Sequence, residues 1–461
     1  MTLLLALDGA ALACLHGWPT HLVAHLAVYV GAGLLWLVLA REPRNARVAL
    51  VVLAAALHVV ALAGSPRHSD DVYRYLWDGA VQQHGVSPYA YAPDDESLAP
   101  LRTPLWNRIN NRPLPTIYPP GAQLAFVAAA ASPSHPLLGW KLIVALGDLA
   151  TVLLLWRARG RAVALVWLSS PLVLVELCVN GHVEAIGVAL FTAALTALPL
   201  RRTLSGALLG LASATKLLPV YLLIALRDRR VLVAASLAIG LAYAPYMGAG
   251  TKVVGSLGEY GRRWRSNDGL FGVLLAGSTE AVAITTGIRA KTDRVELGRA
   301  GPLLTGRDRP QAYPDELAGV VARGFVLILF CLALWRAERS TRDLPIERRA
   351  LLVAQVGMGA FLLLTPALHP WYALWLLPPL LLDDGPRYPH ERAAWLWLVA
   401  TVPLGHVPLV AWLDHRGWHD PLWTRLIEHG PALALLACGP VMRALARVRP
   451  RRRLSSSRRV V

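Results

Sequence analysis

Residues 22–40 read LVAHLAVYVGAGLLWLVLA, a run without Asp, Glu, Lys or Arg. A helix rises about 1.5 Å per residue, so a run of this length crosses most of a hydrocarbon core of about 30 Å. Similar runs recur almost from end to end and predict an all-α polytopic membrane protein, a bundle of about 12–14 transmembrane or re-entrant helices. The predicted segments are 2–17, 22–40, 47–64, 118–134, 137–156, 161–178, 182–199, 204–226, 231–248, 317–335, 349–365, 369–382, 394–413 and 429–447.

The composition excludes other classes of protein. Of the 461 residues, 55% are hydrophobic and 16% are charged, and the mean hydropathy is +0.45. Soluble globular proteins carry about 25% charged residues, so a soluble enzyme or a disordered chain is excluded. An outer-membrane barrel is also excluded, because its strands alternate apolar and polar residues over about 10 positions.

The basic residues indicate how the helices are oriented. The formal net charge is +17, and most of the basic residues are arginines in short loops. This is the positive-inside pattern, which sets topology and favours anionic lipids, so we expect no nucleic-acid partner. The arginine clusters are 41–47, 157–161, 201–202, 227–230, 336–349 and the tail after 443.

The four cysteines give no sign of a special site. Cys14, Cys178, Cys331 and Cys438 are scattered through apolar segments, without a CxxC spacing or a histidine beside them. We expect them to be packing residues, with no disulfide framework and no metal site.

Two polar stretches, Ser65–Ile117 and Ala249–Leu317, interrupt the apolar runs. Residues 1–448 are expected to form one integral membrane domain in which both stretches are outer loops, followed by a basic, disordered cytoplasmic tail at 449–461. Counting crossings from the basic loops agrees with this only if 204–226 is broken near Lys216–Pro219 and 118–134 is re-entrant.

The first outer loop opens with a dense cluster of polar and aromatic residues. On a helix Asp70, Arg74 and Asp78 would stack at i, i+4 and i+8, with Tyr73 and Trp77 in the adjacent row. An acid, a base and aromatic rings would then share one face. The alternative is a surface helix with ion pairs and interfacial Tyr and Trp anchors.

Other ionisable residues fall beside the predicted membrane segments, where they are costly and often functional. Asn180, His182 and Glu184 lie between two apolar runs, Lys216 lies inside one, and His369, Trp371 and Tyr372 begin another. Their plainer interpretations are a loop, a snorkelling lysine and an aromatic belt.

Together these groups indicate one kind of chemistry. Paired carboxylates can take a proton from a hydroxyl, cations such as Arg262 and Arg263 can stabilise a departing phosphate, and aromatic rings stack on sugars. The constellation suits transfer of a sugar from a lipid phosphate to a hydroxyl.

Six motifs in order resemble a known family, the polyprenyl-phosphate-sugar-dependent glycosyltransferases of the C-type superfamily, and most of all its bacterial mannosyltransferase-like branch. The motifs are DDVYRYLWDG at 70–79, GVSPYAY at 85–91, TIYPPGAQ at 116–123, NGHVEA at 180–185, ATKLLP at 214–219 and HPWYALWLLP at 369–378.

The resemblance implies an integral plasma-membrane enzyme with its active site facing the periplasm or exterior. It implies inverting transfer of a hexose, with mannose expected, from a polyprenyl-phosphate donor to a glycan, lipid or protein acceptor. The base falls on Asp71 or Asp70, and the phosphate-contacting cation on Lys216. Further phosphate candidates are Arg74, Arg262, Arg263 and His369, and the expected sugar or acceptor contacts are Tyr73, Trp77, Asp78, Tyr118, Asn180, His182, Glu184, Trp371 and Tyr372.

Two other classes of function stay open from the sequence. Broken helices and intramembrane charges also mark transporters and flippases of lipid-linked sugars, although no inverted repeat is apparent and the charges gather at one face. A non-catalytic scaffold would leave the Asp pair unexplained. We expect no tightly bound cofactor or metal, although a carboxylate pair can recruit a weakly held magnesium or manganese ion.

Overall fold

The computed structural model describes residues 1–41, 47–286, 312–385 and 389–448. Within these ranges the regular structure is helical, apart from one isolated parallel β-bridge between Ser266 and Ala367. The prediction of an all-α polytopic membrane protein is confirmed. The predicted tail, 449–461, lies outside the described residues.

The helices follow the apolar segments closely in the first half of the chain. The α-helices are α1 (Thr2–Cys14), α2 (Leu22–Arg41), α3 (Val48–Ala63), α4 (Asp71–Gln83), α5 (Pro120–Ala130), α6 (Pro136–Arg159), α7 (Arg161–Leu168), α8 (Pro171–Val173), α9 (Glu184–Ala197), α10 (Arg202–Thr215), α11 (Val220–Leu226), α12 (Arg229–Tyr243), α13 (Leu257–Arg263), α14 (Gly269–Thr286), α15 (Ala312–Ser340), α16 (Ile346–Leu364), α17 (Leu377–Leu382), α18 (Pro389–Thr401), α19 (Pro408–Leu413) and α20 (Leu422–Val448). Short 3₁₀ helices include η5 (Ala244–Val254), η7 (Pro370–Leu376) and η8 (Val402–His406), and a π-helix, η4, covers Leu174–Val179.

Five helical runs in the described part of the chain are long and apolar enough to cross a membrane by themselves. They are Leu22–Arg41, Pro136–Arg159, Arg229–Arg263, Leu317–Ser340 and Pro389–Leu413. A sixth candidate is the pair Arg161–Leu168 and Pro171–Val179, which is bent by 52°. Several further apolar helices have only 10–17 residues, so the expected 12–14 spans are not reached by helix length alone.

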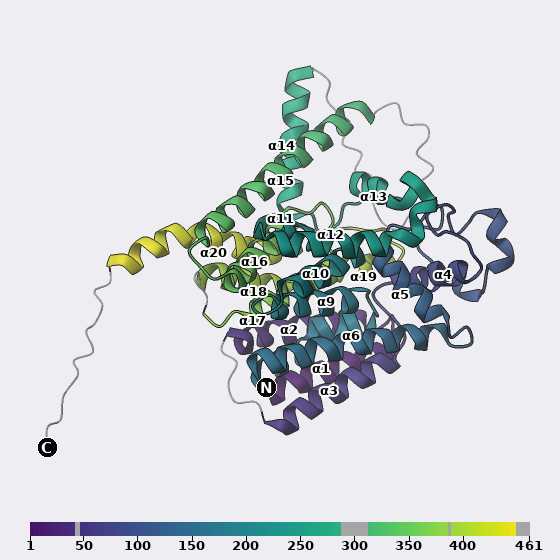
Figure 1. The fold of residues 1–461 in the computed structure, drawn as a ribbon, viewed down its shortest axis with the longest axis horizontal. Helices are drawn as coiled ribbons and strands as arrows, with labels where there is room; N and C mark the ends of the chain where they lie inside the picture. The colour runs from purple at the N-terminus through teal and green to yellow at the C-terminus, as the bar shows by residue number, and fades with distance from the viewer. Residues whose placement is uncertain (42–46, 287–311, 386–388, 449–461) are drawn as a thin grey trace.

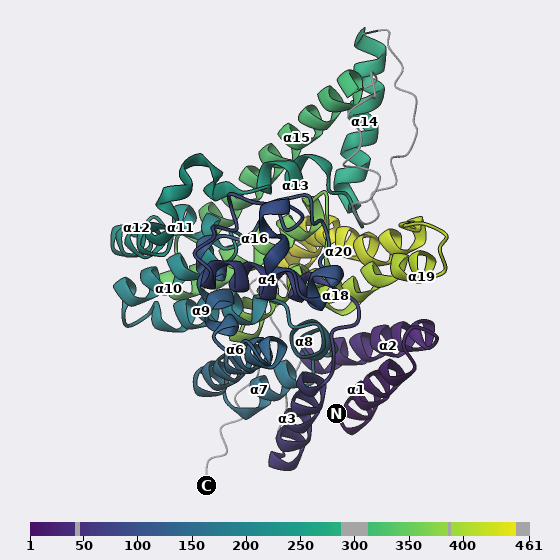
Figure 2. The same ribbon diagram turned by 90° about the vertical axis from the view of Figure 1, so that its right-hand side faces the viewer.

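Most of the long helices run in roughly one direction and form a bundle (Figure 1). In it α10 packs between α9 and α12, α6 lies against α9, and α1 pairs with α2. The loop helices α4, α5 and α13 gather at one end, which faces the viewer in Figure 2. The helices α14 and α15 pack on each other and project together from the bundle.

The predicted break inside 204–226 is confirmed. Helix α10 ends at Thr215, Lys216 is extended with φ −152° and ψ 132°, and α11 begins at Val220. Pro219 explains the interruption, because proline disfavours helical geometry in the residue before it and donates no backbone hydrogen bond.

The second polar stretch, Ala249–Leu317, is expected from the sequence to be an outer loop. It contains α14, an apolar helix from Gly269 to Thr286 that packs on α15. Its neighbours in sequence are strongly polar, so the stretch as a whole reads as a loop. Residues 287–311 of this stretch lie outside the described residues.

Helix α4 is not the surface helix of the alternative interpretation. Every residue from Val72 to Gly79 is buried. Gly79 explains how α5 comes so close, since a Cβ atom at this position would lie 2.2 Å from the carbonyl oxygen of Phe126. The polar groups of α4 are therefore enclosed by protein.

Candidate active site

A cavity of about 440 Å³ is lined by residues of α4 and α13. These helices lie at one end of the bundle, which faces the viewer in Figure 2. The cavity wall combines the start of α4, the loop before α5, the break between α10 and α11, α13, and residues 365–372. Segments recognised from separate motifs therefore meet at one cavity. The predicted site residues in its wall are Asp70, Asp71, Arg74, Tyr118, Lys216, Arg263, His369, Trp371 and Tyr372.

The two carboxylates of Asp70 and Asp71 are held together by one amide. Asn110 Nδ2 donates to Asp70 Oδ1 at 2.6 Å and to Asp71 Oδ1 at 3.0 Å. The Tyr118 hydroxyl donates to Asp71 Oδ2 at 3.2 Å. Asp71 is the first residue of α4, where the helix dipole favours a negative charge. Its side chain is 20% exposed, so the carboxylate keeps an open edge.

Arg74 and Asp78 form the predicted i, i+4 pair, with Nε 2.8 Å from Oδ1 and both side chains buried. Asp78 Oδ2 also accepts a hydrogen bond from Gln123 at 3.0 Å. Arg74 Nη2 is buried without a hydrogen-bond partner, although the side chain lines the cavity. This guanidinium therefore retains a donor for a ligand.

Lys216 reaches the cavity from the helix break. Its ammonium forms an ion pair with Glu184, which is fully buried at the start of α9. The ammonium also lies 4.6 Å from the centre of the Tyr372 ring. The Tyr372 hydroxyl is 2.8 Å from that of Tyr260, which ties α13 to η7.

Trp371 is stacked between two imidazoles. The His182 ring lies 3.9 Å from the indole with an interplanar angle of 23°, and the His369 ring lies 4.6 Å away at 3°. Trp371 and His369 line the cavity, whereas His182 lies behind the indole and is fully buried.

Seven predicted site residues do not line the cavity. The Arg262 side chain is 73% exposed and donates to Glu259. The Tyr73 ring lies 4.1 Å from the Arg108 guanidinium, and burial raises the pKa of its hydroxyl. The geometry does not favour direct substrate contact by any of the seven. They are Tyr73, Trp77, Asp78, Asn180, His182, Glu184 and Arg262.

Sequence reasoning missed Glu176 and His406. Glu176 is fully buried in the π-helix, with Oε1 2.7 Å from His406 Nε2 and Oε2 accepting from Asn180 at 3.0 Å. His406 lines the cavity. The sequence did contain a signal for this site, because Glu176 is a lone acid inside the apolar run 161–178. An ionisable group at membrane depth is costly without a partner.

Three further residues of the site region were also missed as site residues. Asn110 carried no sequence signal, because it lies in an irregular polar loop. Tyr260 and Arg265 line the cavity and belong to a stretch that is conspicuously basic for an outer loop. Arg265 Nη2 lies 2.6 Å from Asp268 Oδ2, and Arg425 binds the other oxygen of that carboxylate at 2.8 Å.

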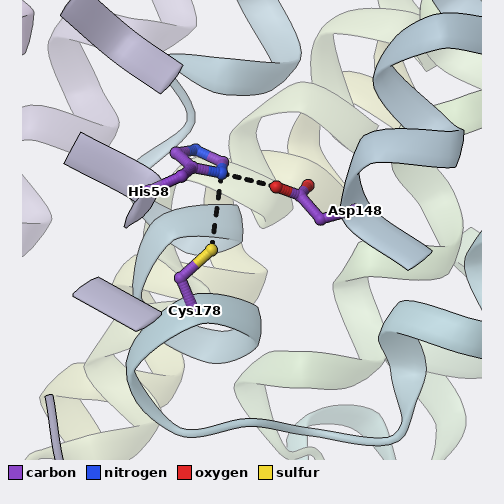
Figure 3. A group of neighbouring side chains, drawn as sticks. All are labelled: His58, Asp148 and Cys178. Atoms are coloured by element: carbon purple, nitrogen blue, oxygen red, sulfur yellow. Dashed lines mark hydrogen bonds and ion pairs between the residues drawn. The ribbon is translucent and has the colours of Figure 1, made fainter. Parts of the chain in front are cut away.

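Cys178 contradicts the expectation that no cysteine has a histidine partner. Its Sγ atom lies 3.4 Å from His58 Nδ1, which is itself 2.6 Å from Asp148 Oδ2 (Figure 3). Bonds of about 2.0–2.3 Å to one zinc ion would separate neighbouring ligand atoms by more than about 3 Å. The 2.6 Å contact is therefore a hydrogen bond. In this geometry the three residues, which could otherwise supply metal ligands, form a hydrogen-bonded cluster joining α3, α6 and the π-helix.

Comparison with known proteins agrees with the chemistry of the cavity. Residues 6–232 match a family model described as alpha-(1->6)-mannopyranosyltransferase, N-terminal domain. The chain is also 28% identical over 437 residues to the polyprenol-phosphate-mannose-dependent alpha-(1-2)-phosphatidylinositol pentamannoside mannosyltransferase of Mycobacterium tuberculosis, covering 90% of this chain and 91% of the relative. Both similarities are to mannosyltransferases, so the chain is a glycosyltransferase that is similar to the mannosyltransferase-like branch of the C-type superfamily. As a glycosyltransferase it is an enzyme, so the transporter and scaffold interpretations do not describe its class.

Proposed function

We propose that this glycosyltransferase transfers mannose from a polyprenyl-phosphate-mannose donor to a hydroxyl of a glycolipid acceptor. The observation that carries the proposal is the open edge of the Asp71 carboxylate in a cavity that also presents Lys216 and Arg263. The dependence of the mycobacterial relative on polyprenol-phosphate-mannose and its phosphatidylinositol mannoside acceptor support this choice of donor and acceptor.

In the proposed reaction Asp71 acts as the general base. Its free carboxylate edge removes the proton from the acceptor hydroxyl as the hydroxyl oxygen attacks the anomeric carbon. The bond from that carbon to the phosphate oxygen breaks, and the electron pair leaves on the polyprenyl phosphate. Lys216, Arg74 and Arg263 stabilise the departing charge. A single displacement of this kind inverts the anomeric centre.

The reaction is proposed to take place on the periplasmic or exterior face of the bacterial plasma membrane. The basic loops at 157–161 and 201–202 support this orientation by the positive-inside rule, because the cavity is built from the stretches expected on the opposite side. In this proposal residues 1–448 form one membrane domain, with 65–117 as the catalytic loop.

A transfer assay with the purified protein tests this function. The donors are polyprenyl-phosphate-mannose, polyprenyl-phosphate-glucose and GDP-mannose, and the acceptors are extracted membrane glycolipids. We expect mannosylated glycolipid and free polyprenyl phosphate only with the first donor, detected by mass spectrometry. If the enzyme accepts only GDP-mannose of the three donors, the proposal is overturned. Addition of EDTA to the assay tests a separate prediction, that any divalent cation is weakly held.

A further inference from the structure

His182 is a buried imidazole between two carboxylates. Its Nδ1 atom lies 3.9 Å from Asp71 Oδ2, and its Nε2 atom lies 3.4 Å from Glu176 Oε2. Neither ring nitrogen has a hydrogen-bond partner, and the residue is fully buried. The imidazole is therefore positioned to exchange protons with these two carboxylates.

The ring is fixed from both sides. Trp371 stacks on it at 3.9 Å. The preceding Gly181 has φ +73°, a backbone conformation that residues other than glycine rarely adopt. The Gly181 carbonyl accepts a hydrogen bond from the Trp140 indole at 2.6 Å. The short turn that carries His182 is thus anchored to α6 and to η7.

Glu176 is held as firmly. It accepts hydrogen bonds from the Tyr29 hydroxyl at 3.1 Å and from the Asn180 amide at 3.0 Å, and His406 Nε2 lies 2.7 Å from its Oε1. A π-helix is rare and is often found at functional sites. Since His406 lines the cavity, the chain of contacts that starts at Asp71 returns to the cavity.

The 3.9 Å contact has a simple explanation in terms of protons. If His182 carries its proton on Nε2, facing Glu176, the lone pair of Nδ1 faces the ionised Asp71 carboxylate and no hydrogen bond forms. Once Asp71 is protonated, its O–H can donate to Nδ1. A hydrogen bond at this contact therefore requires a protonated Asp71 and a separation shorter than 3.9 Å.

We propose that His182 receives the proton that Asp71 removes from the acceptor, and that Glu176 positions His182 for this step. The inference rests on the proposed function, in which Asp71 is the base. The proton moves from Asp71 Oδ2 to His182 Nδ1, and the imidazolium then lies between two carboxylates. After the product has left, the Nδ1 proton returns to Asp71 and passes from there to water in the cavity, which restores the resting state, with the proton on Nε2, without any co-reactant.

The pH dependence of turnover should report this proton transfer. His182 accepts a proton only when it is neutral, so turnover should rise with pH along an acidic limb. Replacing Glu176 by Gln removes a negative charge opposite Nε2, makes the imidazolium less favourable and moves this limb to lower pH. The titratable or charged groups around His182 are Asp71 of α4, Glu176 of the π-helix, Glu184 of α9, Lys216 after α10, His369 before η7 and His406 of η8.

The experiment measures kcat, the KM for the donor and the pH profile of the purified wild type and variants. We expect His182→Gln to lower kcat by about 100-fold, the scale of a lost proton-transfer group, with little change in KM. In His182→Ala, added imidazole should restore part of kcat. His58→Gln, a buried histidine away from the cavity, is the matched control for loss of fold, and melting temperatures are compared throughout.

The outcomes separate this inference from the proposed function. Wild-type kcat and pH profile in His182→Gln, with Asp71→Asn inactive, would overturn the relay and leave Asp71 as the base. If imidazole does not restore the kcat lost in His182→Ala, and Glu176→Gln leaves the pH profile of turnover unshifted, both residues serve packing alone. Absence of mannose transfer by the wild type would overturn both proposals.

Discussion

Lys216 and Glu184 form an ion pair at the cavity wall, although 32 residues separate them in sequence. No acidic residue lies near Lys216 in the sequence, so its charge had to be neutralised from far along the chain or by the ligand. The first alternative is realised, since Glu184 is fully buried and its carboxylate meets the ammonium. This pairing changes how a substitution of Lys216 must be interpreted.

Lys216→Met is expected to lower both stability and donor use. Leaving Glu184 as an unpaired buried charge costs about 3–5 kcal/mol, and losing a charge-assisted contact to the phosphate costs about 1.5–3 kcal/mol, or roughly 10- to 150-fold in donor use. Melting temperature and donor kinetics measure the two effects separately.

The double variant Lys216→Met/Glu184→Gln is the control for this prediction. It removes both charges, so the melting temperature should recover while donor use stays low. A double variant with wild-type donor kinetics would show that Lys216 only neutralises Glu184.

Asn110→Ala should lower turnover by about 10- to 100-fold, because the amide holds both carboxylates and hydrogen bonds to charged groups contribute about 1.5–3 kcal/mol. Asp71→Asn should lower it by at least about 100-fold through loss of the base. Initial rates at saturating donor measure both effects. If both Asp71→Asn and Asp70→Asn keep more than about a tenth of wild-type turnover, the base lies elsewhere.

Arg263 and Arg262 form a matched pair for the phosphate site. Both bind Glu259, but only Arg263 lines the cavity, and the Arg262 side chain is 73% exposed. Arg263→Gln should raise the KM for the donor by about 5- to 10-fold, whereas Arg262→Gln should change it by less than about 2-fold, as expected of an exposed ion pair. Equal changes in the donor KM of the two variants would mean that both arginines act only through the positive electrostatic potential around the cavity.

The orientation of the membrane domain can be checked by cysteine labelling. Ser97 and Lys252 are exposed residues of the two stretches expected outside, whereas Ser278 is buried in α14 and is unsuitable. In a background in which the exposed Cys331 and Cys438 are replaced by Ala, Ser97→Cys and Lys252→Cys should react with an impermeant maleimide on intact cells.

Arg201→Cys, in a basic loop expected inside, serves as the control and should react only after permeabilisation. The reverse pattern of labelling would place the cavity on the cytoplasmic side and contradict the proposed site of transfer.

Local sequence rules predicted the features that depend on near neighbours. The break at Lys216–Pro219 follows from the backbone chemistry of proline, and the Arg74–Asp78 pair follows from helical spacing. Helix α14 was missed because Gly269–Thr286 is enclosed by polar sequence, and only its packing on α15 distinguishes it from a loop.

The buried contacts of Glu176 could not be predicted in the same way. Its partners Tyr29 and His406 are 147 and 230 residues away, and no periodic pattern links positions at such separations. Burial of an acid in an apolar run indicates that a partner must exist, but only the packing of the bundle identifies it.

The π-helix Leu174–Val179 has a consequence for insertions and deletions. Each of its turns contains about one residue more than an α-helical turn, because its hydrogen bonds span five residues instead of four. Removing one residue would let the segment wind as an α-helix, and because the extra residue of the π-turn is then lost, Asn180 and His182 would keep nearly the same direction relative to α7, whereas Glu176 inside the segment would turn. A single-residue deletion here should therefore disturb the contacts of Glu176 more than the path of the chain that follows, whereas the same deletion in a regular α-helix would rotate all later residues by about 100°.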